Sequence, residues 1–374
     1  MIAPNDFIPS TYTHSIDNGN FQWSAPSNIA LVKYWGKKEN QIPANPSISF
    51  TLNNCKTITK LAFVKKHFDA STSSAQAIST DMKFSFDLLF EGKPKEDFKP
   101  KIQKFFERIE NYLPFLKEYH FTIDTQNTFP HSSGIASSAS GMAALAMNLM
   151  SLEKALNPAM TEEYFFQKAS FLARLGSGSA CRSIKGSVVV WGEHKNTKGS
   201  SDLFGVEFPN QIHEIFNHFQ DTILLVDKGE KQVSSTVGHD LMHNHPYAQN
   251  RFAQAHVNLD KITAVFASGD LNEFIKIVES EALTLHAMMM ASMPYFILMK
   301  PNTLEIINAI WKFRNETNIP VCFTLDAGAN VHVLYPKNNK EIVLEFIKGK
   351  LVGYCQNGQY ICDEIGKGSV NFQR

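Results

Sequence analysis

Residues 130–140 read Pro-His-Ser-Ser-Gly-Ile-Ala-Ser-Ser-Ala-Ser, between an apolar stretch that predicts a strand at 119–125 and a small-residue helix predicted near 137–153. Small side chains let backbone amides come close to a ligand, and the first turn of a helix offers free N–H groups and the positive end of its dipole. The stretch therefore suits a polyphosphate. Its composition equally suits a helix that packs closely against a neighbour, because neither GxxxxGK(S/T) nor GxGxxG is present.

Outward from this stretch, the pattern predicts an α+β chain. Its 374 residues are too many for one ordinary core and comfortable for two domains. The first domain is expected to contain strands and helices at 56–66, 81–91, 98–116, 119–125, 137–153, Thr161 to about Leu175, and 186–191. The second is expected to contain a strand at 221–227, helices near 240–265, 270–291 and 302–317, strands at 320–326 and 331–335, a helix near 339–349 and a tail strand that completes the layer.

The expected division of the chain follows its composition. Residues 1–20 are polar, contain Pro4 and Pro9, and are predicted to form a loose arm. The polar segment 192–203 is the best candidate for a boundary between a first domain at 21–200 and a second at 201–374.

The bulk composition excludes several classes of protein. The 36 basic and 36 acidic residues balance, which argues against a nucleic-acid partner because phosphate binding needs excess positive charge. No segment reaches the roughly 18–20 consecutive apolar residues that span a bilayer, and the first residues lack the pattern of a secretory signal. The five cysteines form no CxxC pair. We therefore expect a cytoplasmic protein with free thiols and no membrane partner.

Four further segments, together with the 130–140 stretch, resemble the sequence motifs of one protein family. They are residues 24–37 (Ser-Ala-Pro-Ser-Asn-Ile-Ala-Leu-Val-Lys-Tyr-Trp-Gly-Lys), residues 176–183 (Gly-Ser-Gly-Ser-Ala-Cys-Arg-Ser), the set Ser234-Ser235-Thr236, Gly238, Glu281-Ala282 and His286-Ala287, and residues 324–330 (Thr-Leu-Asp-Ala-Gly-Ala-Asn). In this order they resemble the diphosphomevalonate decarboxylases of the GHMP kinase superfamily. His131, where these enzymes often have Thr or Lys, and Ala329, where they have Pro, depart from the pattern.

The resemblance implies a fold and a reaction. The fold is the two-domain GHMP kinase fold, with a ribosomal protein S5 domain 2-like N-terminal domain and a ferredoxin-like C-terminal domain. The reaction, a carboxy-lyase step of isoprenoid biosynthesis in the mevalonate pathway, uses ATP to phosphorylate the 3-hydroxyl of mevalonate 5-diphosphate. Loss of phosphate and carbon dioxide then gives isopentenyl diphosphate. Mg²⁺ is implied with phosphate oxygens and water as its main ligands, so no side chain is assigned to the metal. A homodimer is also implied.

Three residues are the catalytic candidates. Asp326 is expected at a strand end beside a tight turn, where a carboxylate can orient the hydroxyl proton and favour positive charge at the tertiary carbon. The guanidinium of Arg182 can grip the substrate carboxylate with two charge-assisted hydrogen bonds. Lys33 lies inside an apolar strand, where a lysine is costly unless paired, and the resemblance puts it beside the aspartate.

Other residues receive binding roles by resemblance. The candidates for the substrate are Asn28, Tyr34, Lys37, Ser177 and Ser179, although Asn28 equally suits a structural role at its strand end. The candidates for the ATP phosphates are Ser133, Gly134, Ala136, Ser137 and Ser138. Trp35 is expected to be a wall of the site.

Several alternatives share parts of this pattern. A kinase that stops at 3-phosphorylation, a decarboxylase of the 5-monophosphate and a non-catalytic ligand-binding relative would all have the same fold. Residues 239–243 (His-Asp-Leu-Met-His) resemble the zinc-protease HExxH string, but Asp replaces Glu, and an exposed helix start is the simpler expectation. The methionines at 288–290 and Met293 are expected to fill a core or an interface.

Overall fold

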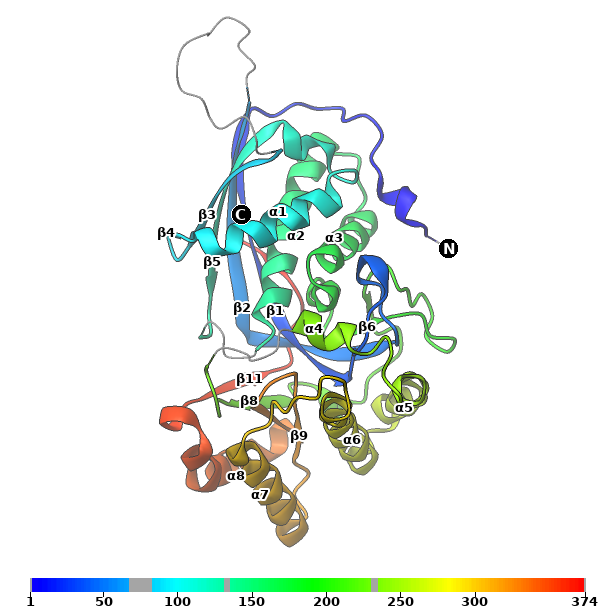
Figure 1. Cartoon of the computed structure of the whole chain (residues 1–374), viewed down its shortest axis with the longest axis vertical. Coiled ribbons are helices and arrows are strands. Elements are labelled where there is room, and N and C mark those ends of the chain that lie inside the picture. Colours follow the sequence, from blue (N-terminus) through cyan, green and yellow to red (C-terminus); the bar gives the residue numbers. More distant parts are fainter. Residues whose placement is uncertain (1, 67–82, 131–134, 230–234, 373–374) are drawn as a thin grey trace, which may run out of the picture.

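The structure, a computed structural model, describes residues 2–66, 83–130, 135–229 and 235–372. Its strands form two sheets, one above the other in Figure 1. The larger sheet has the order β12-β1-β2-β5-β3-β4, with β6 paired to β2 and β7 to β6. Its strands are β1 (Asn18–Val32), β2 (Ser47–Lys65), β3 (Ser85–Phe90), β4 (Lys93–Pro94), β5 (Tyr119–Asn127), β6 (Val188–Trp191), β7 (Val206–Glu207) and β12 (Val370–Asn371).

The smaller sheet is antiparallel throughout and has the order β11-β8-β10-β9. Its strands are β8 (Gln220–Leu224), β9 (Cys322–Thr324), β10 (Val331–Tyr335) and β11 (Tyr360–Glu364). The helices that follow β8 in the chain are α4 (Ser235–Asp240), α5 (Ala248–Ser268), α6 (Leu271–Met290), α7 (Pro301–Thr317) and α8 (Lys340–Phe346). The predicted mixed architecture with two layers of helix and sheet is confirmed.

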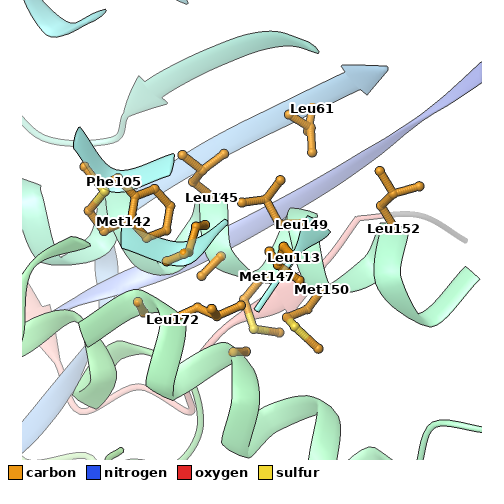
Figure 2. Packing of buried hydrophobic residues seen from close by; sticks show 14 of the residues in the cluster. Leu61, Phe105, Leu113, Met142, Leu145, Met147, Leu149, Met150, Leu152 and Leu172 are labelled. Carbon is orange, nitrogen blue, oxygen red and sulfur yellow. The ribbon is translucent and has the colours of Figure 1, made fainter. Parts of the chain in front are cut away.

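Three helices cover one face of the larger sheet: α1 (Lys99–Ile109), α2 (Ser137–Leu156) and α3 (Glu162–Gly176). The central one, α2, packs against the sheet on one side and against α3 on another. Figure 2 shows its Leu145 and Leu149 among Leu61 of β2 and Phe105 of α1. A helix enclosed on several sides needs small residues, so the close-packing explanation of this segment holds for the body of α2. Its first turn stays accessible, with Ser138 exposed.

The predicted start of α3 is confirmed by its cap. The Thr161 hydroxyl accepts a hydrogen bond from the N–H of Tyr164 at 3.2 Å. This bond satisfies one of the free donors of the first turn, where Glu162 and Glu163 also oppose the helix dipole.

The prediction of a loose N-terminal arm is wrong. Residues Pro4–Phe7 form a 3₁₀ turn, and residues 18–20 already belong to β1. The Phe7 side chain is 1% exposed and its ring lies 4.5 Å from that of Phe171. Composition misled the prediction because one buried aromatic ring is enough to anchor an otherwise polar segment.

We expect Phe7→Ala to lower the free energy of unfolding by about 3 kcal/mol, because it removes a buried ring and leaves a cavity. Chemical denaturation followed by fluorescence measures the change. Ile8→Ala is the control, since Ile8 is 46% exposed. Equal stability of the two variants would show that the arm contributes nothing to the core.

The tail differs from the prediction in its final strand. As expected, β11 completes the smaller sheet, but β12 crosses back and pairs with β1 of the larger one. Between the sheets, the buried carboxylate of Asp363 accepts hydrogen bonds from the N–H groups of Asn53, Asn54 and Cys55, at 2.7–2.9 Å. The C-terminal segment therefore ties the two sheets together.

Two further expectations concern the chain as a whole. The five cysteines are free thiols, four of them buried. Among the described residues, no helix combines the length and apolar character that crossing a membrane requires.

Candidate active site

Lys33 and Asp326 meet at the junction of the two sheets. Contrary to the prediction, Lys33 does not lie inside a strand but directly follows β1, and it is 1% exposed. Asp326 follows β9, as predicted for a strand end. The Lys33 Nζ lies 3.1 Å from Asp326 Oδ1. Burial lowers the pKa of the Lys33 ammonium, and the carboxylate of Asp326 opposes this effect. The Asp326 side chain is 29% exposed, so the carboxylate contacts a buried cation and is also partly accessible to solvent.

Arg182 is buried in the 3₁₀ segment Gly178–Ser183 that follows α3. Its Nε donates to Asn28 Oδ1 at 3.3 Å and its Nη1 donates to the hydroxyl of Ser47. Burial lowers the pKa of Arg182, and the negative charge of Asp326 acts in the opposite direction. The guanidinium is therefore held in place by neutral partners, with the charge of Asp326 acting on it from the same site.

Asn28 holds the Arg182 side chain in position through hydrogen bonds. Its Nδ2 donates to Ser183 Oγ at 2.8 Å and to the carbonyl of Ser179 at 3.2 Å, while its oxygen accepts from Arg182. Of the two roles left open by the sequence, the structural one is filled. Ser47, for which the sequence predicted no role, completes this support from β2.

The segment after Lys33 packs against α4. The ring of His239 lies 4.3 Å from that of Tyr34 and 4.5 Å from that of Trp35. Trp35 is 4% exposed and belongs to a buried hydrophobic cluster. The N–H of Gly36 donates to His239 Nδ1 at 3.0 Å, and Lys37 Nζ lies 3.4 Å from Asp240 Oδ1.

The expectation of an exposed helix start is therefore wrong for His239, which is half-buried near the end of α4, whereas His243 is exposed. Burial lowers the pKa of His239 to about 3, so its ring is neutral at physiological pH and can accept the Gly36 hydrogen bond. The covering segment is distant in the sequence, with Gly36 lying 203 positions away, and no local pattern reveals it. Within the described ranges, no group of three or more His, Cys, Asp or Glu side chains is arranged to hold a metal ion.

The methionines divide between core and surface. Met288 and Met289 are buried, as expected, in a cluster with Trp35, whereas Met293 is 81% exposed.

The start of α2 lies beside Ser177, next to the segment that contains Arg182. Ser133 and Gly134 lie outside the described residues, whereas Ala136, Ser137 and Ser138 form the cap and first turn of α2. Ala136 has a φ of 40°, in the left-handed region. The hydroxyl of Ser138 is 3.4 Å from that of Ser177, which follows α3. Ser177 and Ser179, both partly exposed, lie in the chain between this contact and Arg182.

A cavity of about 300 Å³ opens next to this helix start. It lies between the sheet strands β2, β3 and β5 and the helices α1 and α2. Its wall is largely apolar, with a few hydroxyls, and includes Phe90, Phe98, Ile102, Ile123, Met142, Leu145, Thr57, Thr59 and Thr125. An apolar slot with a few polar groups is typical of a site for a flat organic group.

Comparisons with known proteins agree with this geometry. The diphosphomevalonate decarboxylase-like N-terminal domain matches residues 25–202, and the mevalonate 5-diphosphate decarboxylase C-terminal domain matches residues 222–371. The diphosphomevalonate decarboxylase of Saccharomyces cerevisiae is 30% identical over 339 residues, which are 87% of this chain and 80% of the relative. That of Ganoderma lucidum is 29% identical over 345 residues, which are 87% of this chain and 80% of the relative.

Solved structures are similar over nearly the whole chain. The mevalonate diphosphate decarboxylase of Staphylococcus aureus is 27% identical with a TM-score of 0.78, covering 95% of this chain and 98% of that one. The structure of MDDEF in complex with MVAPP, AMPPCP and magnesium is 28% identical with a TM-score of 0.77, covering 95% and 99%. Both domains and their order are therefore shared, and the chain belongs to the diphosphomevalonate decarboxylase family.

Proposed function

We propose that this protein uses ATP to decarboxylate mevalonate 5-diphosphate to isopentenyl diphosphate, by phosphorylation of the 3-hydroxyl and then loss of phosphate and carbon dioxide. The observation that carries the proposal is the buried Lys33 ammonium, 3.1 Å from the partly open carboxylate of Asp326, in a site that also holds Arg182. The membership of the chain in the decarboxylase family, whose relatives include a complex with MVAPP, AMPPCP and magnesium, supports it.

Asp326 acts on the reacting carbon and its hydroxyl. The adjacent Lys33 ammonium favours the ionised form of the carboxylate, which can accept the hydrogen bond of the 3-hydroxyl. As the phosphate leaves, positive charge develops at the tertiary carbon, and the same carboxylate stabilises it. A plain kinase would not need this second effect, so the pairing favours decarboxylation.

Arg182 binds the carboxylate that will leave as carbon dioxide. Asn28 and Ser47 hold two of its nitrogens, which fixes the plane of the guanidinium. A planar fork fixed in this way binds a carboxylate with little loss of side-chain entropy. Tyr34, Lys37, Ser177 and Ser179 contribute to the binding of the diphosphate and carboxylate region.

ATP lies along the start of α2. Its phosphates bind at the residues predicted for this role, which are Ser133, Gly134, Ala136, Ser137 and Ser138. The free N–H groups and the dipole of the helix that begins at Ser137 favour anions, and the base occupies the apolar cavity beside Gly141. Ser137 and Ser138 are the first two residues of α2, and Ser138 lies beside Ser177. Their hydroxyls suit phosphate oxygens or the Mg²⁺ ion that phosphates bind. That ion, when bound, neutralises charge on the phosphates.

The placement of the base predicts the effect of a single substitution. A side chain at Gly141 would meet open space, because no atom lies within 4 Å of the position that its Cβ would occupy, and Gly141 lines the cavity. We expect Gly141→Leu to raise the KM for ATP by about tenfold through loss of pocket volume, while helix propensity favours the variant by about 1 kcal/mol. Steady-state kinetics and thermal unfolding measure the two effects. Gly141→Ala is the control, and an unchanged KM in Gly141→Leu would move the base elsewhere.

The test of the function is a coupled assay with Mg-ATP, in which ADP, phosphate and carbon dioxide are followed together. We expect equal release of all three from mevalonate 5-diphosphate. Release of ADP without carbon dioxide would establish a kinase instead. Turnover of the 5-monophosphate alone would identify the monophosphate as the substrate instead. No turnover of any candidate would support a non-catalytic, ligand-binding relative.

We also propose that the enzyme is a cytoplasmic homodimer, with a first domain at 21–200 and a second at 201–374. The free thiols are consistent with a reducing compartment, and two-fold pairs are the commonest oligomers. Light scattering after size-exclusion chromatography measures the mass, and a mass near the 42.0 kDa of one chain would exclude the dimer.

A further inference from the structure

The main chain of Lys33 is held outside the sheet. β1 ends at Val32, and its register with β2 shifts just before this point. The N–H of Lys33 donates to Glu281 Oε2 at 2.8 Å. Its carbonyl accepts from Asn45 Nδ2 at 2.9 Å and from Arg251 Nη2 at 3.0 Å. These side chains replace the ladder partners that a strand residue would have.

Glu281 is the centre of this arrangement. It lies on α6, is fully buried, and forms a two-pronged ion pair with Arg251 of α5, at 3.1 and 2.5 Å. Asn258 Nδ2 also donates to it at 2.6 Å. Burying such a pair costs desolvation free energy that its attraction barely offsets, so stability alone is a poor reason for it. The distinctive effect of the Glu281–Arg251 pair is that it binds the N–H and the carbonyl of Lys33, which lies 248 positions before Glu281.

The same helix also holds Asp326. His286, five residues after Glu281, is 1% exposed, and its Nε2 lies 3.1 Å from the carbonyl oxygen of Asp326. Because a carbonyl only accepts, Nε2 must carry the proton. Burial lowers the pKa of His286 to about 4, so the ring is neutral at physiological pH. One helix therefore contacts the main chains of both members of the Lys33–Asp326 pair.

We propose that Glu281 and His286 are positioning residues, which set the separation of the Lys33 ammonium and the Asp326 carboxylate by holding their main chains on one rigid helix. The inference rests on the proposed function, because the separation matters for catalysis only if these two groups act on the substrate. Neither residue needs to touch the substrate. The two hydrogen bonds from Arg251 orient the Glu281 carboxylate toward the strand end.

A matched pair of variants tests Glu281. Glu279, on the same helix, is also buried and also forms a two-pronged pair, with Arg314 at 2.7 and 3.1 Å, and accepts from Trp311 at 2.9 Å. It faces α7 and not Lys33. Glu281→Gln and Glu279→Gln therefore break similar bonds on one helix, and only the first loosens the reacting pair.

We expect Glu281→Gln to lower kcat by about 100-fold, because small displacements of reacting groups cost this much. The KM for ATP and the one-to-one ratio of ADP to carbon dioxide should stay close to those of the unmodified protein. Glu279→Gln should keep kcat while losing thermal stability to a similar degree. Equal loss of kcat in both variants, per folded molecule, or no loss in Glu281→Gln, would overturn the role of Glu281.

His286 provides a second test if Glu281→Gln does not fold. His286→Leu removes the donor, whereas His286→Gln keeps an N–H at similar reach. We expect kcat to fall in the first and to recover in the second. Crystal structures of both variants measure the Nζ–Oδ1 separation without turnover, and it should increase from 3.1 Å in His286→Leu. An unchanged separation in His286→Leu would contradict the proposal, whereas an inactive unmodified protein would instead refute the proposed function.

Discussion

Asp326→Asn is expected to lower kcat and kcat/KM for mevalonate 5-diphosphate together, by about 1,000-fold or more. The amide keeps the shape of the side chain but loses the charge, so it can neither accept the hydroxyl proton nor stabilise the cationic centre. An equal loss in the two constants is the signature of an interaction made only in the transition state. Release of ADP and of carbon dioxide, measured in the same assay, should fall in parallel.

The fold is expected to survive this change, because the Asp326 side chain is partly exposed. The Lys33 ammonium loses its partner, and burial then favours its neutral form. Asp87→Asn is the control, since the Asp87 side chain is 63% exposed and contacts only His120 among the ion pairs of the described residues. If Asp326→Asn retained more than about a tenth of kcat, well above the activity expected after removal of a catalytic base, Asp326 would not be the reacting carboxylate.

Arg182→Lys is expected to lower kcat/KM by about 100-fold to 1,000-fold, or about 3–4 kcal/mol, as for other changes to a buried charged contact. The charge is kept, but the fork is lost. Lysine cannot donate to Asn28 and Ser47 and still present two donors to the substrate carboxylate. Steady-state kinetics at several substrate concentrations separate the effect on KM from that on kcat.

Arg314→Lys is the matched control for Arg182→Lys. Arg314 also donates from both terminal nitrogens, to Glu279, but at a distance from the Lys33–Asp326 pair. We expect it to lower stability and leave kcat/KM essentially unchanged. Similar losses of kcat/KM in the two variants would mean that Arg182 acts through the fold and not through the substrate carboxylate.

Local pattern was sufficient for most elements of the fold. The helix from Thr161 was predicted because a hydroxyl cap precedes two acids, and α2 because its small residues continue over its length. Errors arose where a distant partner decided the outcome. Phe7 is buried by Phe171, and the tail strand β12 returns to β1, although neither segment carries a periodic signal of its own.

The candidate site divides in the same way. Lys33, Arg182 and Asp326 could be named because each lies in a string that resembles the diphosphomevalonate decarboxylases and each carries a group that their reaction needs. Ser47, Asn45 and Arg251 could not, because they act through hydrogen bonds to other residues and any local pattern would accept them as ordinary polar side chains. His239 was misjudged for the related reason that its covering rings come from the extension of β1.

The sequence by itself determined which chemical groups are present: an aspartate after one apolar strand, a lysine next to another, and an arginine in a small-residue turn. Only the tertiary structure decided that the first two lie 3.1 Å apart and that one helix, α6, contacts the main chains of both. The physical reason is the difference in sequence separation between the interactions involved. Residue type and periodicity report on neighbours within a few positions, whereas the separation of Lys33 and Asp326 is set by packing between segments that lie 293 positions apart.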